Sequence, residues 1–208
     1  MSNHLVKQIY NSRKYILEIL EERGFDISDY QNFSMDEIHS MVPNQQLDLL
    51  LTGKSKKIYI KYNIVKALRP NNLYDLIDDL YNLENILTKN DDLIIINKDE
   101  PNDTLLNTVK EIWLKDKIYI AIININRLQF NILKHELVPK HTILSDKEKD
   151  KMKKKYNISD DNMIPNISYF SPVSLVLGMR PGDICKIDRF SKTAIDGEFY
   201  RICTLDVK

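Results

Sequence analysis

The stretch that decides the fold reads HELVPKHTILSDKEKDKMKKKYNISDD from His135 to Asp161 and resumes as YFSPVSLVLGMRPGDICKIDRFSKTAIDGEFYRIC from Tyr169 to Cys203. Ser145 and Glu148 have the spacing of a capping box, which predicts a short basic helix. Pro172 suits the first turn of a second helix. Two segments, DICKIDRF and EFYRICTLDV, alternate apolar and polar residues and predict antiparallel strands. These elements indicate a small α+β domain.

The sequence Arg180-Pro181-Gly182-Asp183, which is typical of a tight turn, separates the second helix from these strands. Proline fixes one backbone angle, and glycine permits a positive φ. The carboxylate of the aspartate can accept hydrogen bonds from the amides of the turn itself. We expect the helix before the turn to end at Gly178 and the strands after it to join through Ile195-Asp196-Gly197. The shape of this turn, rather than any reactive group, is its expected contribution.

The chain divides into a first domain over residues 1–133 and a second domain over residues 134–208, with no linker between them. In the first domain, helical periodicity extends as far as Gly24, where a left-handed helix cap is least costly. Ser34 followed by Glu37 matches another capping box and predicts a short second helix.

Strands then alternate with helices along the first domain. LDLLL and KIYIKY flank a TGKSK turn and predict a β-hairpin, and DDLIIIN and KIYIAIINI predict buried strands. RLQFNIL is expected to form another short strand, and Asn72 and Asp103 are expected to cap the two intervening helices. This order predicts an α/β sandwich with an at least partly parallel sheet.

The bulk composition excludes several classes of function. The 30 basic and 30 acidic residues give a formal net charge of zero, so no global basic field attracts nucleic acid. The two cysteines, Cys185 and Cys203, lie in apolar-alternating segments and predict buried thiols rather than disulfides or zinc ligands. No apolar run is long enough to span a membrane, and the N-terminus does not match a signal peptide. We expect a soluble, intracellular protein without a cofactor or a membrane contact.

Two polar clusters could suggest chemistry. His135 and His141 are six residues apart across Pro139, which is not the spacing of a structural zinc site, so no metal site is predicted. The lysine-rich run at residues 147–155 spreads its charges around a helix and has no interleaved aromatic platform. A solvated helix face is the favoured interpretation, and direct phosphate contact is the alternative.

The two segments that open this section closely resemble, in their order and spacing, the C-terminal assembly domain of the fifth common subunit of eukaryotic RNA polymerases, shared by polymerases I, II and III. The small archaeal counterpart of that subunit is similar to this domain alone. The resemblance covers residues 135–203 and implies a non-catalytic structural subunit whose C-terminal domain docks on the largest polymerase subunit. The residues that it places on the docking surface are His135, Pro139, His141, Pro172, Gly178, Arg180, Pro181, Gly182, Asp183, Lys186, Arg189, Ser191, Tyr200 and Arg201.

The first domain resembles the family mainly in the order of its elements. In the eukaryotic form, this domain is the lower jaw beside duplex DNA downstream of the active centre. The DNA-proximal turn of the family corresponds to Pro101 and Asn102, although the acidic neighbours Glu100 and Asp103 would repel phosphate. The implied partners are the other polymerase subunits and, weakly, downstream DNA, and a homo-oligomer is not expected. The divergence from the family and a composition rich in Asn, Ile, Lys, Asp and Tyr, typical of an AT-rich genome, favour a large DNA virus as the source. The expected locations are then the virion and the host cytoplasm, and a cellular protein would be nuclear.

The alternative function is a free-standing nuclease or nucleic-acid-binding protein. The hairpin followed by αβαβ resembles the restriction-endonuclease scaffold, in which carboxylates from two strands hold a metal. Asp48 could be the first ligand and Lys61 stands on the next strand, but the position two before it is Tyr59. One carboxylate cannot hold a catalytic Mg²⁺. We therefore expect no nuclease activity.

Overall fold

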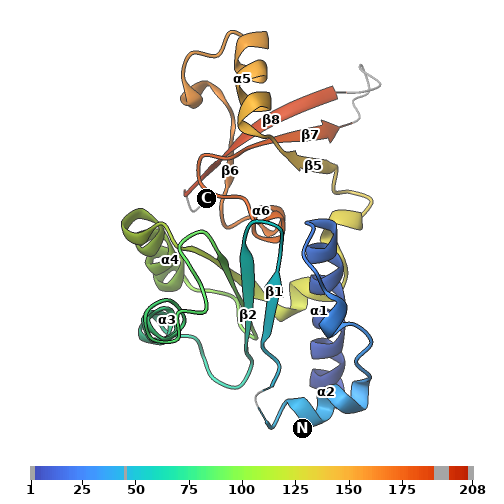
Figure 1. Ribbon diagram of the computed structural model, residues 1–208. Coiled ribbons are helices and arrows are strands. Elements are labelled where there is room, and N and C mark those ends of the chain that lie inside the picture. The colour runs from blue at the N-terminus through green and yellow to red at the C-terminus, as the bar shows by residue number, and fades with distance from the viewer. Residues whose placement is uncertain (1–2, 45, 190–196, 206–208) are drawn as a thin grey trace. The chain divides into compact units, whose positions relative to one another are not determined.

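The sheet of the N-terminal part combines a hairpin with parallel strands. The computed structural model describes residues 3–44, 46–189 and 197–205, and the chain forms two units, Met1–Asn131 and Ile132–Lys208 (Figure 1). In the first unit the strand order is β1-β2-β3-β4, with β1 and β2 antiparallel and the other two pairings parallel. The strands are β1 (Leu49–Thr52), β2 (Lys57–Asn63), β3 (Asp92–Asn97) and β4 (Tyr119–Asn124). The expected hairpin and partly parallel sheet are therefore confirmed.

Helices cover both faces of this sheet, which explains why every residue of β3 and β4 is buried. Figure 1 shows α3 and α4 on one face and α1 on the other. The helices are α1 (Asn3–Glu22), α2 (Met35–Met41), α3 (Pro70–Ile77) and α4 (Asp103–Asp116). Gly24 has a φ of 87°, and Ser34 and Glu37 form the expected capping box.

Two expected helix caps are wrong by one to three residues. The helix assigned to Asn72 begins earlier, at Pro70, because a residue before proline prefers extended backbone and Arg69 has φ −120° and ψ 156°. The last turns of this helix widen into a π-helix, η2 (Asp78–Leu83). The cap of α4 is Asn102 rather than Asp103, because its side chain accepts from the backbone N–H of Leu105 at 2.9 Å.

The expected strand RLQFNIL is also wrong. Its residues form the end of one 3₁₀ helix, η3 (Ile125–Leu128), and the start of another, η4 (Ile132–Lys134). The side chain of Asn124 accepts from the backbone N–H of Asn126 at 2.7 Å and so starts η3. Ile125 and Leu128, three residues apart, are both buried, which is the spacing of a helical turn.

The second unit is a four-stranded sheet in the order β5-β7-β8-β6, carrying two helices. Its elements are β5 (Lys140–Ile143), α5 (Asp146–Lys155), β6 (Asn166–Ser168), α6 (Pro172–Leu177), β7 (Ile184–Arg189) and β8 (Gly197–Thr204). β7 and β8 are antiparallel, as the sequence predicts. β5 and β6 were not predicted from the sequence, and the expected join at Ile195-Asp196-Gly197 lies mostly outside the described residues.

One hydrophobic cluster of the second unit consists of Leu144, Met152, Ile164, Ile184 and Ile202. Other apolar residues of the same unit are also buried, among them Tyr169, Leu175, Val176 and Met179. Both cysteines are free and buried, and burial raises the pKa of the Cys203 thiol to about 12 and raises that of Cys185 as well. The prediction of buried thiols is confirmed. Within the described residues, no helix is long and apolar enough to cross a membrane.

Candidate partner-binding and nucleic-acid-proximal sites

The turn from Arg180 to Asp183 is closed by its own aspartate. The side chain of Asp183 accepts from the backbone N–H of Arg180 at 2.8 Å, and the backbone N–H of Asp183 donates to the Arg180 carbonyl at 2.9 Å. Gly182 has a φ of 93°, which confirms the expected left-handed backbone. The shape of the turn is therefore set by its own hydrogen bonds.

Three further contacts hold the turn against the rest of its unit. The N–H of Gly182 donates to the Cys203 carbonyl at 2.9 Å, and the N–H of Cys203 donates to the Asp183 carbonyl at 2.8 Å. Lys149 of α5 lies 3.2 Å from Asp183. The turn, which follows α6 in the sequence, thus contacts β8 and α5, which are distant from it in the sequence.

One residue expected on the docking surface is buried in its own unit. Gly178 is buried, has a φ of 70° and ends α6, and its N–H donates to the Leu175 carbonyl at 3.3 Å. Pro172 is the first residue of the same helix, and the side chain of Ser171 accepts from the backbone N–H of Ser174 at 3.3 Å. Both residues shape the segment that leads into the turn, and Gly178 presents no side chain to a partner.

The two histidines are held by local hydrogen bonds. Nδ1 of His135 accepts from the backbone N–H of Leu137 at 3.2 Å, and Nδ1 of His141 lies 2.6 Å from the Pro139 carbonyl. His141 also lies on β5, paired with Ile187. Among the residues that the structure describes, no three His, Cys, Asp or Glu side chains are placed to hold a metal ion.

Lys186, Tyr200 and Glu198 form a polar network on β7 and β8. The ammonium of Lys186 lies 3.1 Å from Glu198 and 3.1 Å from Asp188, and the Tyr200 hydroxyl donates to Glu198 at 3.0 Å. Hydrogen bonds to these acids raise the pKa of Lys186, while hydrogen bonds from Lys186 and Tyr200 lower the pKa of Glu198. Burial and the Glu198 carboxylate raise the pKa of Tyr200 to about 12.

The remaining expected docking residues lie at the surface with different exposures. The exposed ones are His135, Gly182, Arg189 and Arg201, and the half-buried ones are Pro139, His141, Pro172, Arg180, Pro181, Asp183, Lys186 and Tyr200. Ser191 lies outside the described residues. Leu137 and Phe199, which are 84% and 48% exposed, are not among the expected docking residues. Phe199 is an apolar residue at an exposed position of β8. An aromatic residue among polar neighbours is the sequence signal that could have indicated a contact surface here.

Three of the six lysines on helix α5 pair with acids of their own unit. Lys149 also approaches Asp146 at 3.5 Å, Lys153 pairs with Asp161 at 2.6 Å, and Lys155 lies 3.6 Å from Glu198. These pairs support a solvated helix face rather than a phosphate-binding stripe.

In the first unit, the candidate nuclease residue Asp48 is fully engaged by its neighbours. Its Oδ2 accepts from Lys61 Nζ at 2.6 Å and from the Tyr59 hydroxyl at 3.1 Å, and its Oδ1 accepts from the backbone N–H of Tyr62 at 3.0 Å. Burial, followed by the charge of Asp48, raises the pKa of Tyr59. Tyr59 therefore keeps its proton and donates it to Asp48, whereas a second metal ligand at this position would have to offer an oxygen lone pair to the metal. The group acts as a structural hydrogen-bond cluster.

The expected DNA-proximal residues lie in the loop between β3 and α4. Asn102 is exposed, but its side-chain oxygen caps α4, while Pro101 is half-buried. Glu100 beside them forms a two-pronged ion pair with Arg127, with both N–O distances at 3.0 Å. This pair neutralises one of the acids that would repel phosphate.

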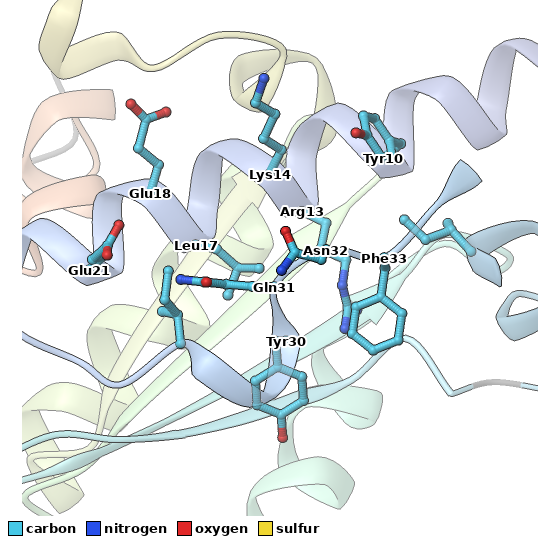
Figure 2. A pocket seen from close by; sticks show the side chains of 12 residues that line it. Tyr10, Arg13, Lys14, Leu17, Glu18, Glu21, Tyr30, Gln31, Asn32 and Phe33 are labelled. Carbon is cyan, nitrogen blue, oxygen red and sulfur yellow. The ribbon is translucent and has the colours of Figure 1, made fainter. Parts of the chain in front are cut away.

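A groove that was not expected from the sequence runs along α1 (Figure 2). It has a volume of about 310 Å³ and lies between α1 and residues 27–33. Arg13, only 3% exposed, donates to the Leu47 carbonyl at 3.2 Å and lies 4.8 Å from the Phe33 ring and 5.7 Å from the Tyr30 ring. Burial lowers the pKa of Arg13. Its position on the apolar stripe of α1, four residues after Ile9, is the sequence feature that could have revealed it.

Comparison with known proteins relates both units to one group. Residues 130–203 match the family "RNA polymerase Rpb5, C-terminal domain". The chain is 28% identical over 186 residues to "DNA-directed RNA polymerases IV and V subunit 5B" of Arabidopsis thaliana, covering 86% of this chain and 81% of that protein. It is 44% identical over 78 residues to "DNA-directed RNA polymerase subunit Rpo5" of Pyrococcus abyssi, covering 38% of this chain and 94% of that protein. The archaeal match thus has about the length of the second unit of this chain.

Proposed function

The chain belongs to the family of fifth subunits of DNA-directed RNA polymerases, and we propose how its two units divide the work of such a subunit. The second unit, Ile132–Lys208, docks on the largest polymerase subunit. The first unit, Met1–Asn131, forms the lower jaw and lies beside downstream DNA. Neither unit carries out a reaction of its own.

The observation that carries this division is the length of the archaeal match. A relative that is a polymerase subunit is covered over 94% of its length by 38% of this chain. A unit that makes up nearly a whole polymerase subunit elsewhere is expected to hold the contacts needed for assembly. The first unit is then an addition with a separate role.

The geometry of the turn from Arg180 to Asp183 supports docking by the second unit. Its shape is set by hydrogen bonds to itself, to β8 and to α5, so little conformational entropy remains to be lost on binding. Exposed Leu137 and Phe199 supply apolar surface on the same unit. We propose that these two side chains join the docking surface.

Non-catalytic character is supported by the residues around Asp48. Its carboxylate already accepts from Lys61, Tyr59 and the Tyr62 amide. Binding of Mg²⁺ would require breaking these contacts and would still lack a second acidic ligand. No observation favours the nuclease alternative.

Co-expression with the largest polymerase subunit of the same source tests the division of roles. Residues 1–131, residues 132–208 and the full chain each carry an affinity tag, and the captured partner is quantified. We expect the full chain and residues 132–208 to retain the largest subunit and residues 1–131 to lose it. Retention by residues 1–131 alone would show that assembly belongs to the first unit.

A further inference from the structure

A basic hollow lies at the carboxyl end of β2 in the first unit. It has a volume of about 530 Å³ and is bounded by the sheet, by the loop that follows β2, and by the start of α3. Its lining residues are Lys61, Asn63, Lys66, Ala67, Leu68, Arg69, Asn72, Leu76 and Ile95. This set holds three cations and two amides but no carboxylate. Sites for ligands in such sheets commonly lie outside the carboxyl ends of parallel strands.

The loop that supplies Lys66 and Arg69 is fixed in place. The side-chain amide of Asn63 donates to the Lys66 carbonyl at 2.9 Å and to Oδ1 of Asn97 at 2.9 Å. Asn97 is the residue of β3 that pairs with Asn63. At the other end of the loop, Pro70 holds Arg69 in an extended conformation. The two cations are therefore presented by a backbone that is ordered before any ligand arrives.

The charges of the hollow do not cancel. Lys61 is offset by Asp48, 2.6 Å away, so it contributes little net charge. Lys66 and Arg69 are exposed, and neither takes part in an ion pair with any residue that the structure describes. The positive end of the α3 dipole lies beside them and adds to the same field.

The neighbouring loop at the same sheet edge has no net positive charge. It contains Lys98, Asp99 and Glu100 and leads into Asp103; Glu100 is paired with Arg127, and the Asn102 oxygen is used as a helix cap. An anion approaching this edge is therefore attracted more strongly to the loop after β2 than to the loop after β3. The phosphate contact expected at Pro101 and Asn102 is therefore better made by Lys66 and Arg69.

We propose that the hollow lined by Lys66 and Arg69 binds backbone phosphates of duplex DNA. The proposal rests on the placement of the first unit beside downstream DNA. Phosphate suits this lining because Arg69 can contact two oxygens with its planar guanidinium while Lys66 acts as a point charge. Contact with the backbone alone predicts binding without sequence preference.

The test compares two double variants of the full chain. Lys66→Gln with Arg69→Gln removes the two free cations of the hollow. Lys89→Gln with Lys115→Gln removes two exposed cations near the amino ends of β3 and β4, at the opposite edge of the same sheet. Both variants lose two positive charges, so they differ in where on the sheet the charges are removed. Thermal unfolding verifies that each variant remains folded.

Binding to a fluorescent random-sequence duplex is followed by anisotropy as salt is varied. At about 50 mM salt we expect the hollow variant to bind roughly tenfold or more weakly, and its slope of log K against log salt to shrink by about 1.8, which corresponds to two lost phosphate contacts. The opposite-edge variant should keep most of the wild-type slope. Equal losses in both variants would overturn the site, because they would show a diffuse charge effect.

Absence of any duplex binding by the wild-type chain at low salt would overturn the site as well. The same affinity measurement is made with an acidic peptide as the ligand instead of DNA. If the hollow variant loses affinity for the peptide as it does for DNA, the hollow is an acidic-protein site, and the DNA proposal is overturned. Capture of the largest subunit, measured on the same variants, reports on the proposed assembly role independently. A failed phosphate site with intact capture leaves the assembly role standing.

Discussion

Replacing Gly182 with valine should deform the docking turn through its backbone alone. The φ of Gly182 is 93°, and a Cβ at this position would meet no heavy atom within 4 Å. The cost is therefore backbone strain, about 1–2 kcal/mol for an L-residue in left-handed space. If the backbone relaxes instead, the hydrogen bond from Gly182 to Cys203 is lost, at about 1 kcal/mol. The second unit, Ile132–Lys208, has a total stability on the order of 4–12 kcal/mol by size, so a loss of this size is a large fraction of it.

The matched control is Gly24→Val in the first unit. Gly24 has a φ of 87°, and a Cβ at this position would likewise meet no heavy atom within 4 Å. The substitution therefore imposes the same kind of backbone strain at a position distant in sequence from the turn. We expect Gly182→Val to lower the melting temperature of the 132–208 fragment and to abolish capture of the largest subunit. Gly24→Val should leave capture unchanged, and Gly182→Asn should be intermediate because asparagine tolerates this region.

The measurement combines thermal unfolding by circular dichroism with capture of the co-expressed largest subunit. Capture by Gly182→Val at the wild-type level, despite a lowered melting temperature, would show that the shape of the turn is not read by the partner. Equal loss in Gly24→Val would attribute the effect to general instability. Either outcome would remove the turn from the docking surface.

Three further outcomes are expected. Asp48→Ala should destabilise the chain by about 1–3 kcal/mol in urea titrations, because three donors lose their acceptor, and neither it nor the wild type should cut DNA with Mg²⁺ or Mn²⁺. Cys203 should resist iodoacetamide in the folded chain at neutral pH, and labelling at the rate of unfolded protein would contradict this. Because the pKa of Cys203 in the folded chain, about 12, exceeds the ordinary value of 9.0, the free energy of unfolding should fall as pH rises from 9.0 to about 12. Arg13→Lys should destabilise the chain more than Arg13→Met, since lysine keeps a buried charge without the planar contact to Phe33; the reverse order in urea melts would show that this site needs a positive charge or a hydrogen-bond donor more than it needs the planar contact.

Sequence reading succeeded where the determining interactions are local. The capping box of Ser145 and Glu148 is present, with the Ser145 N–H donating to Glu148 at 2.8 Å, because its partners are three residues apart. The aspartate closure of the turn at Arg180 is local for the same reason. β3 and β4 were recognisable because helices bury both faces and every position is apolar or a buried polar residue.

Sequence reading failed where a distant segment decides the structure. β6 has three residues and becomes a strand through parallel pairing with β8, more than thirty positions further along the chain. β5 alternates exposed and half-buried side chains, and gains its structure from pairing with β7. The Arg13 groove needs residues 27–33 to fold back on α1, and nothing in a local window specifies that contact.

A net charge of zero conceals two different local arrangements. In the second unit, Lys149, Lys153 and Lys155 each face an acid within 4 Å, so half of the six lysines in the run have their charge offset internally. In the first unit, which has an excess of acidic residues, Lys66 and Arg69 stand at a sheet edge without such partners among the described residues. Since exposed charges act over about 10 Å at moderate salt, local pairing decides where an anion binds and net charge does not. A DNA contact is therefore expected on the more acidic unit.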